Sequence, residues 1–307
     1  MEDVTDAVFR YFCKKYGADI MYTEFVSSDG LAHKNKKTAE KLKLYDYERP
    51  VGIQIYGHIP ESMVEAAKIV EEADPDIIDI NFGCPVKKIA KRGAGCGMMR
   101  DIPTMLKITK EVVKAVKKPV TVKTRLRWDN STTPVDEIAE QLQDCGIQAL
   151  TIHGRSGAQL YKGEADWDLI GKVKNNPRII IPVIGNGDVT SGEIAKDKIE
   201  KYGVDAIMIG RGSIGKPWIF KDIKQYLQSG ENYEPSLSEK IDHIIEHINK
   251  SVEIRGDRIG ILLMRRHLAV YFKSIPNFRE YKIRLLTTDS KNELFDILEE
   301  IRIKFAV

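Results

Sequence analysis

One cysteine of this sequence lies at the end of a predicted buried strand, in a setting that suits chemistry. Residues 79–85, DINFGCP, begin with alternating apolar side chains and end at Cys84 and a proline. A proline restricts the residue before it to extended conformations, which fixes the direction of the Cys84 thiol. Four cations follow: Lys87, Lys88, Lys91 and Arg92. A lone cysteine is most often a small buried residue, but these cations favour a functional position.

Three polar residues interrupt otherwise apolar predicted strands, each near the C-terminal end of its strand. They are Gln54 in VGIQIYG, Lys123 in VTVKTRL and His153 in LTIHGR. A single buried polar side chain is usually satisfied by neighbouring backbone groups, because burial without a partner is costly. Three of them at the same end of three strands favour a shared polar ligand. A flavin fits, because its pyrimidine edge needs donors and acceptors and Lys123 would balance the charge of the reduced ring.

Two glycine-rich turns follow the last two predicted strands. IGNGDV carries Asn186, Gly187 and Asp188, and IGRGSIG carries Gly210 and Arg211. Either turn alone is an ordinary strand-to-helix connection. Two of them at consecutive strands predict a phosphate site, in which backbone N–H groups and the arginine bind the anion. No GxGxxG motif follows a predicted strand, so the sequence does not favour a Rossmann-type dinucleotide site.

The elements that position these residues alternate between strand and helix. Apolar runs predict seven strands, at 20–25, 51–56, 77–82, 120–124, 149–153, 182–185 and 206–209. The amphipathic stretches between them predict helical crossovers, and this alternation predicts an α/β fold with a parallel sheet. Polar motifs at nearly every strand end favour a (β/α)8 TIM barrel with one strand missing over an open, doubly wound sheet.

A second unit is predicted after the barrel. The alternation stops near residue 230, a linker with Gly, Pro and Ser follows, and the rest of the chain has apolar residues at helical spacing. We therefore predict a barrel over 1–230 and a helical domain over 237–307.

The predicted helical domain carries a basic segment. Residues 254–284 contain eight basic residues against two acidic ones, with four aromatic residues between them: Tyr271, Phe272, Phe278 and Tyr281. Basic residues interleaved with aromatic ones suit phosphate contacts and base stacking. The segment therefore predicts a nucleic-acid contact, although some of these aromatic residues are expected in the core.

Composition narrows the class of protein. The chain has 307 residues, a net charge of +3 and no apolar run long enough to span a membrane, so we expect no membrane partner. We also expect a monomer. Its four cysteines form no CxxC pair and no zinc spacing, so we expect no metal site and a reducing, cytoplasmic location. The N-terminus, MEDVTDAVFR, lacks the apolar region of a secretory signal.

Taken together, these motifs resemble the tRNA-dihydrouridine synthases of the bacterial B-type. The resemblance rests on QIYG, DINFGCPVKK, GAGCGMM, VKTRLRW, YKGEADW, IGNGDV and IGRGSIGKPWIF, with a looser match in the tail through RRHLAVYFK. It implies an FMN-binding barrel with a C-terminal helical domain that reduces uridine in tRNA, with NADPH as the reductant.

The resemblance assigns the catalytic role to Cys84. In this family the cysteine of the GCP motif lies over the flavin and protonates the base, while the flavin N5 supplies a hydride to C6 of uracil. Negative charge then develops on the C4 oxygen and on C5, and C5 takes its proton from the face opposite the flavin. A thiol with its ordinary pKa of about 8.5 is protonated at neutral pH and can supply that proton.

The resemblance also assigns RNA contacts. A base must leave its stack to reach a flavin, which brings its phosphates to the rim of the pocket. We expect Lys87 and Arg92 to bind that backbone and Asn81 to contact the uracil edge. From the tail, we expect Arg265 and Arg266 to bind the RNA.

The N-terminus departs from the family pattern. Relatives carry a strand that ends in APM before the VTD motif, and Met1 occupies the place of that methionine. We therefore expect the first barrel strand to be absent from this sequence, and we expect Met1 to lie at the flavin.

Two other functions fit part of the pattern. A small-molecule FMN oxidoreductase, similar to dihydroorotate dehydrogenases or ene-reductases, shares the barrel and the phosphate turns but has no need for a basic helical tail. A non-catalytic RNA-binding protein leaves Gln54, Lys123 and His153 unexplained. Bound flavin, detected by its visible absorption, would separate this last function from the two enzymes.

Overall fold

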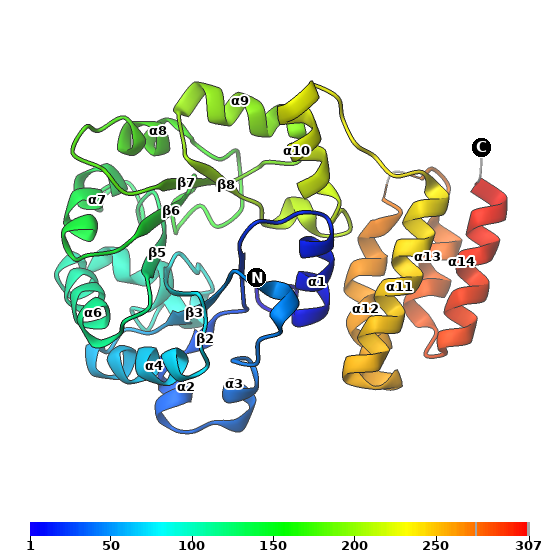
Figure 1. Cartoon of the computed structure of the whole chain (residues 1–307), viewed down its shortest axis with the longest axis horizontal. Helices are drawn as coiled ribbons and strands as arrows, with labels where there is room; N and C mark the ends of the chain where they lie inside the picture. Colours follow the sequence, from blue (N-terminus) through cyan, green and yellow to red (C-terminus); the bar gives the residue numbers. More distant parts are fainter. Residues whose placement is uncertain (274, 306–307) are drawn as a thin grey trace.

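The computed structural model describes residues 1–273 and 275–305 and has two parts, a curled parallel sheet surrounded by helices and a helical bundle at its side (Figure 1). The strand order is β1-β3-β4-β5-β6-β7-β8, with β2 also paired to β3. The strands are β1 (Met21–Tyr22), β2 (Val26–Ser27), β3 (Val51–Tyr56), β4 (Ile77–Phe82), β5 (Val120–Arg125), β6 (Ala149–His153), β7 (Val183–Asn186) and β8 (Ala206–Met208). The predicted TIM-barrel class is confirmed.

Helices follow the strands and then form the bundle. Those around the sheet are α1 (Ala7–Lys15), α2 (Ser28–Ala32), α3 (Lys36–Glu40), α4 (Pro60–Glu72), α5 (Lys87–Ala90), α6 (Ile102–Ala115), α7 (Val135–Asp144), α8 (Asp168–Lys174), α9 (Gly192–Tyr202) and α10 (Ile219–Ser229), with short 3₁₀ turns η1 (Asp46–Glu48), η2 (Gly95–Arg100) and η3 (Arg211–Ser213). The bundle consists of α11 (Leu237–Arg255), α12 (Asp257–Tyr271), α13 (Arg279–Thr287) and α14 (Lys291–Phe305).

Six of the seven predicted strands form with ends within one residue of the prediction, and the first is divided. The predicted strand 20–25 is replaced by β1 and β2, which pair with the two ends of β3. Tyr22 lies opposite Gly52 and Val26 opposite Ile55, so three residues on one strand face two on the other. This extra residue is a β-bulge, which turns side chains away from the ladder. Glu24 lies in the middle of the bulge.

The sheet is open at one place in the described part of the chain. β1 and β8 are its two edges, and no ladder joins them. A closed barrel would have one more strand between these edges. The carboxyl ends of all the strands nevertheless meet at one mouth, because all of their pairings are parallel.

Two separate apolar cores support the two parts. The barrel core contains fully buried strand residues such as Ile53, Ile80 and Val122, covered by the apolar faces of the surrounding helices. The bundle core contains apolar residues that recur at the predicted helical spacing in α11 and α14: Ile241, Ile244, Ile248, Leu294, Ile297, Leu298 and Ile301. α11 begins at a capping box between Ser236 and Glu239, which ends the linker from α10.

Helix α1 lies between the barrel and the bundle (Figure 1). Its Phe9 ring lies 4.8 Å from the ring of His267, and its Phe12 ring lies 4.6 Å from that of His243. A third histidine, His247, lies in the same interface. The hydroxyl group of Tyr271 lies 2.8 Å from a ring nitrogen of His243 and 2.8 Å from one of His247. The interface is therefore built around buried imidazoles.

Acid should weaken this interface. Burial lowers the pKa of His243 to about 3, that of His267 to about 4, and that of His247 well below its ordinary value. These imidazoles are neutral in the folded protein, whereas in the unfolded chain they protonate below about pH 6.5. The unfolded state then binds more protons, so stability decreases as pH falls from about 6.5 toward 4. Within that window, each histidine that stays neutral in the folded protein lowers the free energy of unfolding by about 1.4 kcal/mol for each pH unit of acidification.

Urea unfolding midpoints measured across this pH range test the prediction. His267→Gln should show a shallower decrease than the wild type, because one titrating group is removed. His33→Gln, at an exposed position on the barrel, should keep the wild-type decrease. Equal slopes for His267→Gln and the wild type would contradict the assignment.

Candidate active site at the mouth of the barrel

Cys84 lies in a turn directly after β4 that several backbone contacts hold in place. The side-chain oxygen of Asn81 accepts hydrogen bonds from the backbone N–H groups of Gly83 and Cys84, both at 2.9 Å. The Cys84 carbonyl accepts the N–H of Cys96 at 3.0 Å. Gly95 has φ +56°, and a side chain there would come within 2.7 Å of the Cys84 carbonyl oxygen, so glycine is required beside this turn.

The Cys84 thiol is free and protonated. Its residue is 7% exposed, and burial raises the pKa of the thiol above its ordinary value. The Cys84 side chain therefore remains a protonated thiol at neutral pH, as a proton donor must. Cys96 is also free but fully buried, and burial raises its pKa to about 12, so we assign it no chemistry.

A polar network crosses β3, β4 and β5 beneath the turn. Gln54 Nε2 donates to Asp79 Oδ2 at 2.6 Å, and Thr121 Oγ1 donates to Asp79 Oδ1 at 2.6 Å. Asn81 Nδ2 donates to Gln54 Oε1 at 2.7 Å. Each of the two amide nitrogens therefore keeps one N–H for a ligand. The roles of Gln54 toward the cofactor and of Asn81 toward uracil remain predictions.

Asp79 is a residue of this network that the sequence analysis missed. It is fully buried, and burial raises the pKa of its carboxyl group to about 6. The signal was present, because a carboxylate between two isoleucines in a buried strand requires partners. The Asp79 carboxylate accepts the Gln54 N–H and so orients Gln54, which means that Asp79 supports the site from below.

Lys123 and His153 lie in a strongly positive part of the mouth. Burial lowers the pKa of Lys123 to about 8, with a further lowering by Arg125, and among the described residues its ammonium has no hydrogen-bond partner. Burial, together with the charges of Lys123 and nearby arginines, lowers the pKa of His153 to about 2, so its ring is neutral. This excess of positive charge fits an anionic ligand such as a flavin phosphate or a reduced flavin ring.

Arg125 is a second residue that the sequence analysis missed. It is 1% exposed, and its guanidinium donates to the carbonyl groups of Gly83, Ser156 and Leu160, each at 2.8 Å. These contacts join the Cys84 turn to the loop after β6. The VKTRLRW motif contains this arginine, but nothing in the sequence identified the three carbonyl groups as its partners.

The two predicted phosphate turns lie side by side at the ends of β7 and β8. Asn186 Nδ2 donates to the Met208 carbonyl at 2.7 Å, which joins the two strand ends. Gly187 has φ +136°, which suits glycine. The sulfur of Met1 would lie 3.8 Å from a Cβ placed on Gly210, so the structure brings these predicted cofactor residues together.

The carboxylate of Asp188 is already paired in the structure. Arg155, a buried residue that the sequence analysis missed, donates to both of its oxygens at 2.8 and 2.6 Å. The Ala165 N–H also donates to Asp188, and Arg211 lies 3.5 Å away. Asp188 therefore shapes the turn, and its predicted role toward the cofactor remains untested.

An aromatic residue that the sequence analysis did not single out stands at the rim. Tyr161 is 52% exposed, with its ring 5.5 Å from the Arg125 guanidinium and 4.7 Å from that of Arg211. Its ring also lies 6.5 Å from that of His153. The rim therefore offers a planar apolar surface between two cations.

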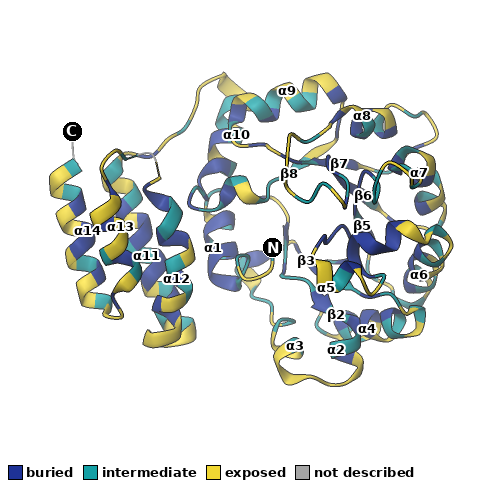
Figure 2. Ribbon diagram, turned by 180° about the vertical axis from the view of Figure 1, so that it is seen from behind, coloured by how far each residue is buried: buried dark blue, intermediate teal, exposed yellow. Residues whose placement is uncertain are grey.

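The cations after Cys84 are exposed, as Figure 2 shows for the segment around α5. Among the described residues, none of the four has an ion-pair partner: Lys87, Lys88, Lys91 and Arg92. They therefore leave free positive charge beside the buried thiol.

The aromatic residues of the basic segment, residues 254–284, do not lie where base stacking would need them. All four aromatic residues of the basic segment are buried in the bundle core, so they are not available for base stacking. Arg265 donates to the carbonyl groups of Thr287 and Thr288 and pairs with Asp289 at 2.5 Å. Arg266 faces Asp3 at 3.8 Å and is exposed. The RNA contacts of both arginines remain predictions.

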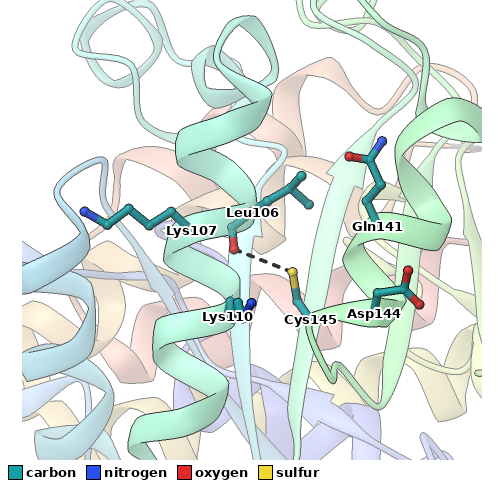
Figure 3. A pocket seen from close by; sticks show the side chains of 6 residues that line it. All are labelled: Leu106, Lys107, Lys110, Gln141, Asp144 and Cys145. Carbon is teal, nitrogen blue, oxygen red and sulfur yellow. Dashed lines mark hydrogen bonds between the residues drawn. The ribbon is translucent and has the colours of Figure 1, made fainter.

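A cavity lies away from the mouth, on the outer surface of the barrel. It has a volume of about 310 Å³ and lies between α6 and α7, near Cys145, whose thiol donates to the Leu106 carbonyl at 3.5 Å (Figure 3). Burial raises the pKa of the Cys145 thiol above its ordinary value, which lowers the fraction of reactive thiolate. The groups that could act together are at the mouth and not in this cavity.

Comparisons with known proteins agree with one another. A family model described as dihydrouridine synthase (Dus) matches residues 1–306. The chain is 38% identical over 284 residues to a probable tRNA-dihydrouridine synthase of Rickettsia prowazekii. The aligned region covers 92% of this chain and 86% of that protein. It is 40% identical over 286 residues to tRNA-dihydrouridine synthase B of Pseudomonas putida, with 92% and 84% covered. For tRNA-dihydrouridine synthase B of Vibrio parahaemolyticus, the identity is 39% over 302 residues, with 97% and 92% covered.

A solved structure also resembles this fold. Histamine dehydrogenase from Rhizobium sp. 4-9 aligns with a TM-score of 0.54 at 14% sequence identity, over 85% of this chain and 46% of that chain. At this identity the likeness concerns the fold alone.

Proposed function

The chain belongs to the dihydrouridine synthase family, and from this premise we propose that it is a tRNA-dihydrouridine synthase that binds FMN and uses NADPH as its reductant. The observation that carries the catalytic assignment is a protonated, buried thiol, Cys84, held at the barrel mouth beside exposed cations. The experiment that tests it is the conversion of uridine to dihydrouridine in unmodified tRNA by the purified, flavin-loaded protein.

The residues at the mouth fit FMN. The remaining N–H of Gln54, the ammonium of Lys123 and the neutral ring of His153 would hold the flavin ring. The turns at Gly187 and Gly210, with the adjacent arginine, would bind the phosphate. When bound, FMN supplies the hydride that adds to C6 of uracil.

Cys84 supplies the proton that C5 requires. Burial keeps the thiol protonated until the base arrives, and the Asn81 contacts hold its turn in one position. The thiolate left after the transfer lies near Arg125 and Lys123, whose positive charges favour the anion. Proton donation by Cys84 and hydride addition at C6 together complete the reduction of the C5=C6 bond.

Exposed groups around the mouth would receive the RNA. Lys87 and Arg92 are free to bind phosphates beside a base that has left its stack. Tyr161 offers a surface on which that base or its neighbour can stack. The four free cysteines are compatible with a reducing compartment, and we place the enzyme in the cytoplasm.

Lys123→Ala should lower the FMN content of the purified protein or slow flavin reduction by NADPH. The reason is that the variant loses a partly buried cation, for which the described residues provide no hydrogen-bond partner, from the place where a reduced flavin would carry negative charge. Flavin absorbance per protein and stopped-flow reduction measure the two effects. The control is Lys118→Ala, because Lys118 pairs with Asp74 on the surface just before β5. Normal flavin content together with normal reduction in Lys123→Ala would contradict this role.

Charge reversal in the tail should weaken tRNA binding. Arg258 and Arg266 are both exposed, and changing both to Glu should reduce the dependence of log affinity on log salt by about one unit per residue. Arg265 is left in place because it holds the end of α13. Filter binding over a salt series measures this, with Lys107→Glu and Lys110→Glu on the outer face of α6 as the control pair (Figure 3). An unchanged salt dependence in this variant would show that these tail residues do not contact the RNA.

A further inference from the structure

A cavity of about 200 Å³ lies where the N-terminal segment, the β-bulge and the helical bundle meet. Asp3, Asp6 and Glu24 line it from the barrel side, and His267 and Leu263 line it from α12. This volume is below the about 300–1,000 Å³ of typical small-molecule sites, so the cavity suits an occupant the size of a single base.

Glu24 brings an unpaired carboxylate to this cavity. It stands in the bulge between β1 and β2, and among the described residues its side chain has no hydrogen-bond or ion-pair partner. Burial raises the pKa of Glu24, and the charges of Glu2 and Asp6 add to this rise, whereas those of Lys41 and the N-terminal ammonium oppose it. The other two carboxylates are partly engaged, since Asp6 accepts the Phe9 N–H at 2.9 Å and Asp3 faces Arg266. Glu24 is therefore the acceptor that is left for a ligand.

His267 provides a second, independent unpaired group. It is 5% exposed, and in the described part of the chain its Nδ1 is a buried atom without a hydrogen-bond partner. Its ring lies 4.8 Å from that of Phe9, which fixes its orientation. A buried ring nitrogen without a partner is costly, and a polar ligand would satisfy it.

The chemistry of these groups limits the ligand. No group of three or more His, Cys, Asp and Glu side chains among the described residues is arranged to hold a metal ion. A carboxylate only accepts hydrogen bonds, so the ligand must present hydrogen-bond donors, and a base presents them as N–H groups. Guanine presents two adjacent donors, N1–H and the 2-amino group, that match the two oxygens of one carboxylate. Adenine, cytosine and uracil each place an acceptor beside their donor, which would repel the second oxygen.

The cavity also lies within reach of the RNA. The segment of residues 1–6 separates it from the mouth, since Met1 lies beside Gly210 and Asp3 lines the cavity. Arg255, at the end of α11, is exposed and also lines it, so it can bind a phosphate of the same nucleotide. Leu263 offers an apolar surface to the face of a base.

We propose that this cavity is a second base pocket, which takes an unstacked guanine of the RNA substrate and reads its N1–H and 2-amino group with Glu24. This inference rests on the proposed function, because the guanine belongs to the same tRNA whose uridine enters the mouth. The pocket would select among RNAs by a base other than the one that reacts.

Saturation-transfer NMR of guanosine with the flavin-loaded protein tests this pocket. Inosine is the matched probe, because it differs from guanosine only by the absence of the 2-amino group. Two variants alter the pocket, Glu24→Gln by removing the acceptor charge and Leu263→Trp by filling the space. Two controls alter neighbours that do not line it, Glu2→Gln and Leu262→Trp, and Leu262 is 42% exposed on the same helix.

We expect guanosine to bind at least about tenfold more tightly than inosine or adenosine, because a hydrogen bond to a charged group is lost with either. Both pocket variants should abolish this preference, and both controls should keep it. Equal binding of guanosine and inosine, tighter binding of adenosine, or a preference that survives in Glu24→Gln and Leu263→Trp would overturn the proposal.

Dihydrouridine formation, measured on the same preparations, separates this proposal from the proposed function. Normal dihydrouridine formation without guanosine binding would overturn the pocket and leave the enzyme assignment intact. Guanosine binding without dihydrouridine formation would support the pocket and count against the enzyme assignment.

Discussion

Cys84→Ala should reduce its flavin with NADPH at close to the wild-type rate and yet form dihydrouridine about 10²–10⁴-fold more slowly, the range that a general acid typically contributes. Flavin reduction precedes the arrival of the base and requires no proton at C5. Uridine reduction requires one, and the thiol that would supply it is protonated and 7% exposed. Stopped-flow reduction followed by a single turnover with unmodified tRNA measures both steps on one sample.

The matched control for this variant is Cys96→Ala. Cys96 is a free cysteine whose backbone N–H contacts the Cys84 carbonyl, so both variants remove a thiol from the same pair of loops. Cys96→Ala should keep near-normal dihydrouridine formation, because burial already prevents its thiol from reaching a ligand. Cys84→Ser should recover little activity, since a hydroxyl group is a much weaker acid. If Cys84→Ala formed dihydrouridine at near the wild-type rate, another group would be the general acid, and Cys84 would be only a small buried residue.

Arg125→Lys should lower dihydrouridine formation by about tenfold to hundredfold while the protein keeps its flavin. Arg125 donates to three carbonyl groups, on Gly83, Ser156 and Leu160. A lysine ammonium cannot reproduce this planar fork, and each buried carbonyl left without a partner costs about 1–3 kcal/mol. The Cys84 turn would then lose the contact at Gly83, and small displacements of a reacting group reduce rates strongly.

Single-turnover rates and flavin content measure this effect together. The control is Arg127→Lys, two residues further along the chain, whose side chain makes no hydrogen bond among the described residues. A rate for Arg125→Lys within twofold of the wild type would show that the Cys84 turn does not depend on Arg125.

The sequence predicts the framework well because the strands are short and those in the middle of the sheet, β3 to β6, are almost entirely buried. Their apolar runs end sharply at polar residues, so both ends of six strands could be placed within one residue. The first strand was predicted wrongly as continuous, because a β-bulge depends on pairing with β3 and leaves no local signal.

The sequence predicts which residues gather at the mouth but not what each of them contacts. Gln54, Lys123 and His153 could be found because a polar residue in an apolar strand is visible in the sequence. The partners could not be found, because they are distant in the chain: Arg125 contacts Gly83, which lies 42 residues away. For the same reason the sequence placed Asp188 at the cofactor but did not show that Arg155 holds its carboxylate.

The basic tail shows the limit of reasoning from composition. Its charges and aromatic residues are interleaved in the sequence, but the helices separate them, with the aromatic rings in the core and most cations outside. Arg265 is an exception, since its side chain joins α12 to the end of α13. Composition alone could not distinguish an exposed cation from one that, like Arg265, joins two helices.

The most direct test of the central claim is mass analysis of the nucleosides of an unmodified tRNA after incubation with the flavin-loaded protein and NADPH. We expect a uridine to gain the mass of two hydrogen atoms, and we expect wild-type protein to produce this dihydrouridine while Cys84→Ala produces almost none. Absence of dihydrouridine from reactions in which NADPH visibly reduces the bound flavin of the wild-type protein would contradict the account.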